Sequence, residues 1–194
     1  MLKRLANKLS EYPGVYTFLR KVIEANFRSQ RKVIKNELGD SGLILDIPCG
    51  VGEFSVFFDK DNYIGLDLSE GYVEYGKKKY NKSMVVGDAR NLPFEKDYFD
   101  SVLVSGFFHH LNEEDVDKVL NESYRVLKED GKLLLIEDAP SRNFVSKWLQ
   151  KYDVGANIRE LGHYIPILSK KFKLEKFYPI KSGLWYYSVF VLRK

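Results

Sequence analysis

The chain has 194 residues, a formal net charge of +4 and a single cysteine, Cys49. This length suits one well-buried domain and is short for two, so we expect a single domain over residues 1–194. The modest charge argues against a nucleic-acid-binding surface, and one cysteine excludes an internal disulfide framework. No apolar run reaches the roughly 20 residues that cross a bilayer, which argues against stable membrane insertion. The N-terminus lacks a continuous signal-peptide core, and a cytoplasmic protein is expected.

The first forty residues have a helical pattern. Leu2, Leu5 and Leu9 recur at helical spacing among basic residues, which fits a small helix docked on the domain or a helix on a membrane surface. Pro13 suits the first turn of a longer helix, and residues 40–42 end it. The apolar positions of that helix, which their periodicity predicts to face the core, are Val15, Phe18, Leu19, Val22, Ile23, Phe27, Val33, Ile34 and Leu38.

Strand-like and helix-like segments alternate over the next hundred residues. The apolar runs predict strands at 43–46, 63–68, 84–88, 99–105 and 132–136. A helix is expected to start near Phe54, another after its cap at Ser69, and a third to cover 116–127. This order predicts a parallel sheet with helices on both of its faces.

The C-terminal part has a different pattern. Residues between about 143 and 170 have helical character, and two strand-like runs at 172–180 and 184–192 follow at hairpin spacing. The predicted fold class is therefore α/β. It is a Rossmann-like, doubly wound, mostly parallel seven-stranded sheet with a C-terminal antiparallel hairpin.

Small and acidic residues gather where the first strands end. Gly50 and Gly52 have no Cβ, so the backbone there can approach a ligand, although a simple turn with two convenient glycines gives the same pattern. Three successive strands end in Asp46, Asp67 and Asp88, at the sheet edge where open α/β folds bind ligands. Asp67 follows Asp46 by 21 positions, which suits an acid that accepts hydrogen bonds from a ribose, or one that caps the next helix.

Five motifs occur in order, at 46–52, 65–69, 86–89, 99–111 and 124–132. Together they resemble the class I S-adenosylmethionine-dependent methyltransferases over nearly the whole chain. In the first motif, Pro48 stands where that family usually has its first glycine. The resemblance implies S-adenosylmethionine as cofactor and S-adenosylhomocysteine as product. The residues that it places at the cofactor are Asp46, Pro48, Cys49, Gly50, Gly52, Asp67, Leu68, Asp88, Ala89 and Ser105.

The resemblance also implies a division of the chain and a reaction. Residues 41–138 form the cofactor-binding core, 139–171 the acceptor-side helices and 172–194 the closing hairpin, while 1–40 form either a lid or a structural layer. The implied reaction moves a methyl group to a small-molecule acceptor, aromatic or lipidic, by direct in-line displacement. Residues 105–108 lack the signature of methyltransferases that act on nucleic-acid bases, and no cluster has metal-ligand spacing.

Candidate catalytic residues follow the fourth and fifth strands. His109 or His110 could act as general base, because histidine titrates near neutral pH, or both could pack against the next helix. Glu137 and Asp138 could receive a cationic substrate or act as base, or they could be solvated or cap a helix. Cys49 is given no catalytic role. The other candidate substrate contacts, each weighed against ordinary packing or a structural layer, are Tyr12, Tyr16, His163 and Tyr164.

Two other functions share part of this pattern. A nicotinamide-dependent oxidoreductase has the same glycine turn and ribose acid, but its fold requires neither Asp88 nor the final hairpin. A cofactor-binding subunit that activates a partner without catalysis would keep all the cofactor motifs. Both stand as alternatives to a methyltransferase.

Overall fold

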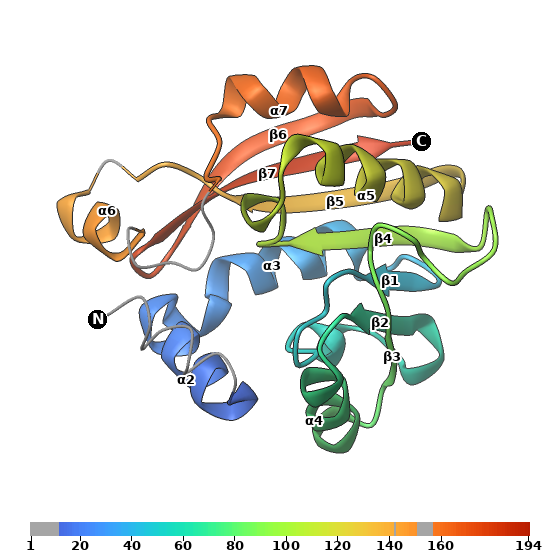
Figure 1. Ribbon diagram of the computed structural model, residues 1–194, viewed down its shortest axis with the longest axis horizontal. Helices are drawn as coiled ribbons and strands as arrows, with labels where there is room; N and C mark the ends of the chain where they lie inside the picture. The colour runs from blue at the N-terminus through green and yellow to red at the C-terminus, as the bar shows by residue number, and fades with distance from the viewer. Residues whose placement is uncertain (1–11, 142, 151–156) are drawn as a thin grey trace.

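A seven-stranded sheet in the order β3-β2-β1-β4-β5-β7-β6 forms the centre of the molecule (Figure 1). The computed structural model describes residues 12–141, 143–150 and 157–194. The strands are β1 (Ile44–Asp46), β2 (Tyr63–Asp67), β3 (Ser83–Val86), β4 (Phe99–Ser105), β5 (Leu127–Asp138), β6 (Lys173–Ser182) and β7 (Trp185–Arg193).

The first five strands are parallel, as the alternating pattern predicts. β1 pairs with β2 on one side and with β4 on the other, while β3 extends the sheet beyond β2 and β5 extends it beyond β4. In this register Asp46, the last residue of β1, lies beside Gly65 and Leu103. The carboxyl ends of β1, β2 and β4 therefore meet at one edge, where ligands of parallel sheets bind.

The last two strands form the predicted hairpin. β7 runs antiparallel to both β5 and β6, so it lies between them in the sheet. Gly183 forms the turn with a φ of +58°, a conformation that costs little only for glycine. The expected mixed sheet with a closing hairpin is confirmed.

Helices cover both faces of the sheet, which is also confirmed. On one face, α5 (Glu113–Val126) and α7 (Leu161–Leu168) pack on a core that includes Leu133 and Leu135 of β5. On the other face, α3 (Arg28–Leu38) and α4 (Glu70–Tyr80) pack on a core that includes Leu134 and Ile136. Both faces of β5 are buried because its side chains alternate between the two cores.

Two local predictions differ from the structure. The connection from β1 to β2 holds only the short 3-10 turns η2 (Ser55–Phe57) and η3 (Lys60–Asn62), so the helix expected near Phe54 is wrong. Phe58 is extended there and stacks on Tyr63 with ring centroids 5.8 Å apart, which takes the backbone out of helical geometry. β5 begins directly after α5, five residues before the predicted start at 132, because Leu127 pairs with Phe99.

The N-terminal helix is broken, contrary to the prediction. α2 (Pro13–Ile23) is separated from α3 by η1 (Ala25–Phe27), whose three residues have φ values of 49°, 58° and 55°. The turn of the β6–β7 hairpin holds this kink, since Leu184 N–H donates to the Ile23 carbonyl at 3.0 Å and Ser182 Oγ to the Glu24 carbonyl at 2.7 Å.

The kink changes which residues reach the core. Val33, Ile34 and Leu38 of α3 are buried as predicted. The expected core-facing residues of α2, namely Val15, Phe18, Leu19 and Val22, are exposed, so that prediction is wrong. A short helix, α6 (Phe144–Gln150), follows β5. Within the described ranges, no helix has the length and apolar character needed to cross a membrane.

Candidate functional site

The turn after β1 forms the floor of a cavity of about 230 Å³ at the carboxyl edge of the sheet. Gly50 has a φ of +53° and Gly52 one of +75°, and a Cβ at Gly50 would meet no atom within 4 Å. Pro48 follows a cis peptide bond. The backbone at Gly50 thus faces open space, as the close-approach interpretation of the glycines requires.

Asp67 is the acid that lies at this floor. Its carboxylate accepts hydrogen bonds from Gly50 N–H at 2.8 Å and Ser69 N–H at 2.9 Å, so it joins the end of β2 to the glycine turn. Burial raises the pKa of Asp67, and these backbone N–H groups partly oppose the rise. Each carboxylate oxygen keeps a second lone pair for a ligand hydroxyl group.

The other two strand-end acids do not line the cavity. Asp46 is buried and accepts a hydrogen bond from Tyr63 Oη at 2.8 Å, and burial raises its pKa to about 7. Asp88 is half exposed and forms an ion pair of 2.7 Å with Arg90, which lowers the pKa of Asp88. Each of the three carboxylates has its own hydrogen-bond donor, and the charge of Asp67 adds to the rise in the pKa of Asp46.

Five of the ten predicted cofactor residues line the cavity: Pro48, Cys49, Gly50, Asp67 and Ser105. Outside its lining, Leu68 is exposed and Ala89 is buried in the core. Burial raises the pKa of Cys49 well above its usual value, which agrees with giving this thiol no nucleophilic role. The assignment of all ten residues to the cofactor stays a prediction.

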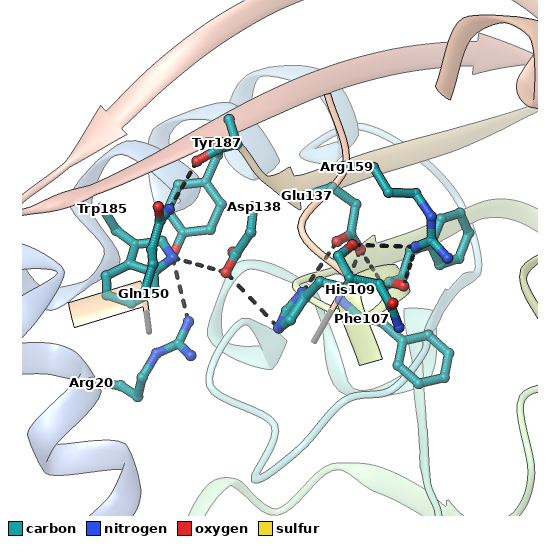
Figure 2. Close-up of polar contacts among 12 residues, drawn as sticks. Arg20, Phe107, His109, Glu137, Asp138, Gln150, Arg159, Trp185 and Tyr187 are labelled. Carbon is teal, nitrogen blue, oxygen red and sulfur yellow. Dashed lines mark hydrogen bonds and ion pairs between the residues drawn. The ribbon is translucent and has the colours of Figure 1, made fainter. Parts of the chain in front are cut away.

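The loop after β4 places the two histidines differently. Phe107 N–H and Phe108 N–H both donate to Glu137 Oε1 at 2.7 Å, and His109 Nδ1 lies 3.3 Å from Glu137 Oε2. Figure 2 shows the buried His109 ring between Glu137 and Asp138. His110 lines the cavity, with its ring centroid 4.0 Å from that of His109.

Glu137 is thus a support for this loop. Its side chain is fully buried and both its oxygens are engaged, outside the cavity lining. Asp138 is likewise buried and accepts a hydrogen bond from Trp185 Nε1 at 2.9 Å (Figure 2). Both acids are buried, so the prediction that they are solvated is wrong. Glu137 holds the loop after β4, and Asp138 holds the Trp185 side chain.

Three of the remaining predicted substrate contacts, His163, Tyr164 and Tyr12, are outside the cavity lining. His163 is on the surface and forms an ion pair of 2.6 Å with Glu113. Tyr164 is buried between Phe108 and Phe190. Tyr12 is exposed, and the side chain of Tyr16 lies outside the described part of the structure. None of the first three lines the cavity beside Asp67.

The N-terminal segment supplies one wall of the cavity. The sequence predicts a lid or a layer there but does not identify the residues that line the cavity. Thr17, Arg20, Glu24, Phe27 and Gln30 line it, opposite the glycine turn. Glu24 is fully buried and accepts hydrogen bonds from Arg20, from Gln30 Nε2 at 2.9 Å and from Tyr187 Oη.

One signal for this wall was present in the sequence. Arg20 and Glu24 are four residues apart, at the spacing of a helical ion pair. Nothing in the sequence linked them to Tyr187 on the last strand, 163 positions beyond Glu24. Among the described residues, no group of three or more His, Cys, Asp or Glu could hold a metal ion.

Comparison with known proteins places this site in a family. Residues 45–135 match the model of a methyltransferase domain. An uncharacterized protein of Methanocaldococcus jannaschii is 33% identical over 68% of this chain and 50% of its own length. The demethylmenaquinone methyltransferase of Lactobacillus johnsonii is 32% identical over 67% of this chain and 57% of its own length. The chain thus spans about half the length of the curated relatives that it matches.

A solved structure agrees with the fold. A SAM-dependent methyltransferase from Archaeoglobus fulgidus superimposes with a TM-score of 0.72 at 19% identity, covering 92% of this chain and 99% of that one. At this identity the likeness supports the fold alone. This fold agrees with the family that the motifs and the domain match indicate.

Proposed function

Because the motifs and the domain match both indicate a class I S-adenosylmethionine-dependent methyltransferase, we propose that this chain transfers a methyl group from that cofactor to a small-molecule acceptor by direct in-line displacement. The observation that carries this proposal is the cavity. It brings the glycine turn and Asp67 together with the β4 end at Ser105 and His110. Both halves of such a reaction, cofactor binding and acceptor alignment, therefore share one site.

The residues around the cavity fit the cofactor. Asp67 would accept hydrogen bonds from the ribose hydroxyl groups, beside the open space at Gly50. When bound, S-adenosylmethionine supplies an electrophilic methyl carbon. The cavity walls hold the acceptor in line with that carbon, and such alignment lowers a barrier by roughly 7–11 kcal/mol.

His110 is the residue proposed to meet the acceptor. It lines the cavity just beyond β4, so its imidazole can accept a proton from the attacking group. His109 contacts the His110 ring and is held by Glu137, so it acts as a positioning residue and not as the base.

The proposed acceptor is aromatic or lipidic. Support comes from the likeness to demethylmenaquinone methyltransferases and from the aromatic lining residues Phe27, Phe54 and Tyr72. No observation favours a subunit without catalysis, and the methyltransferase domain disfavours an oxidoreductase.

Calorimetry with S-adenosylhomocysteine tests the cofactor site. Asp67→Ala should weaken binding by about 2–3 kcal/mol, because the substitution removes charge-assisted hydrogen bonds. Asp59→Ala, at an exposed carboxylate whose side chain caps no helix, is the control and should bind like the parent. Equal affinity of Asp67→Ala and the parent, or binding of NAD in place of S-adenosylhomocysteine, would contradict the proposal.

A further inference from the structure

In the helix α2 polar side chains face the cavity and apolar side chains face the solvent, the reverse of an ordinary surface helix. Its polar residues Thr17 and Arg20, and Glu24 directly after its end, line the cavity. Its apolar residues lie on the opposite side of the helix, because Val15, Phe18, Leu19 and Val22 follow a separate i, i+3, i+4, i+7 stripe. That stripe is exposed, with Phe18 at 63% and Val22 at 66% of full exposure.

The helix α6 carries a second exposed apolar group, formed by Phe144, Val145 and Trp148. Both helices lie toward the same end of the molecule (Figure 1). Arg20 of α2 lies 5.6 Å from the Trp185 ring.

We call these two groups together the apolar face. Its residues are Tyr12, Val15, Phe18, Leu19 and Val22 with Phe144, Val145 and Trp148. Groups of large exposed apolar side chains mark sites of interaction. Aromatic side chains mixed with aliphatic ones are typical of helices that lie at a membrane interface.

The charge of the chain identifies the kind of surface that this face meets. Residues 1–28 contain six Lys or Arg and two Glu, while the rest of the chain contains equal numbers of basic and acidic side chains. The whole net charge of +4 therefore comes from the segment that carries α2. Three of these cations, Lys3, Arg4 and Lys8, alternate with leucines at helical spacing. Basic amphipathic sequences of this kind bind anionic lipids.

We propose that the apolar face docks the protein on the surface of an anionic phospholipid bilayer. The opposite side of α2 lines the cavity, so docking places the cavity one helix away from the lipid. An apolar acceptor dissolved in the bilayer would then reach the cavity without crossing bulk water. The docking itself does not depend on which acceptor is used.

Vesicle sedimentation with the full chain tests the docking. The protein should sediment with vesicles of phosphatidylcholine and phosphatidylglycerol, and less with phosphatidylcholine alone. Phe18→Ser and Val22→Ser should each weaken this binding by about tenfold, because an inserted apolar side chain is lost. Val56→Ser is the matched control, since Val56 is 50% exposed outside the apolar face, and it should bind like the parent.

Tryptophan fluorescence gives a second measurement. The chain has two tryptophans, of which Trp185 is buried and Trp148 is exposed on α6. Anionic vesicles should shift the emission of the parent to shorter wavelength, and Trp148→Phe should remove that shift while the protein still sediments with the vesicles.

Three results would overturn the proposal. They are no sedimentation with anionic vesicles, equal sedimentation of Phe18→Ser and Val56→Ser, and a stable dimer that Phe18→Ser dissociates, which would show that a second copy covers the face. Calorimetry of S-adenosylhomocysteine with the same variants separates this inference from the proposed function. Phe18 and Val22 do not line the cavity, so cofactor affinity should stay unchanged even if docking fails.

Discussion

The buried carboxyl group of Asp46 should make the stability of this protein fall as the pH rises. Asp46 is 1% exposed at the end of β1, and burial raises its pKa from 3.8 to about 7 even though Tyr63 donates a hydrogen bond to it at 2.8 Å. In the unfolded chain the carboxyl group ionises at its ordinary value. Between the two pKa values the folded state therefore holds a proton that the unfolded state has released.

The sign and size of the effect follow from that difference. The stability that Asp46 contributes is fully present below the pKa of this residue in the unfolded chain. It is lost as the pH rises through the pKa of Asp46 in the folded protein. A difference of about 3 pKa units corresponds to roughly 4 kcal/mol of unfolding free energy, at about 1.4 kcal/mol per unit. The hydrogen bond from Tyr63 stabilises the ionised form and so limits how far burial raises the pKa of Asp46.

The assay is urea unfolding of the parent and of Asp46→Asn between about pH 4 and about pH 8. Asparagine keeps the acceptor for Tyr63 and cannot ionise, so the variant should become progressively more stable than the parent as the pH rises. Because Asp67 and the other acids are the same in both proteins, the difference between the two curves isolates Asp46. Parallel curves for parent and variant would refute the reasoning.

Other predictions concern the turns and the N-terminal wall. Gly50→Val should fold with a loss of about 1–2 kcal/mol from its left-handed backbone and should fail to bind S-adenosylhomocysteine by calorimetry. Gly183→Ala should lower the melting temperature, because its Cβ would lie 2.3 Å from the Ile23 carbonyl, whereas Gly162→Ala meets nothing within 4 Å and should not. Hydrogen exchange should show residues 12–30 gaining protection with S-adenosylhomocysteine if they act as a lid; equal protection without it would indicate a fixed layer.

Local sequence determined the sheet and the glycine turn after β1. Two apolar runs specify the strands that end in Asp46 and Asp67. The glycines at 50 and 52 specify the turn that follows the first strand. Such features depend on neighbours along the chain and on the period of the side chains, which the sequence displays directly. The hairpin was predictable for the same reason, since three residues separate its two apolar runs.

Tertiary structure decided which of these residues share the cavity. His109 and His110 are adjacent in sequence, yet one is held by Glu137 in the interior and the other faces the cavity. Asp46 and Asp67 both end strands, yet Asp46 accepts a hydrogen bond from Tyr63 and Asp67 accepts one from Gly50 in the glycine turn. These outcomes depend on partners distant in the sequence, which periodicity does not specify.

The clearest case is the helix α2. Its apolar stripe is visible in the sequence and by itself predicts a core-facing helix. The kink at Ala25–Phe27, held by the hairpin turn at Gly183, points the other side of the helix inward. Glu24 then meets Tyr187, 163 positions away. The sequence determined that α2 is amphipathic, and packing against the last strand decided which side faces the solvent.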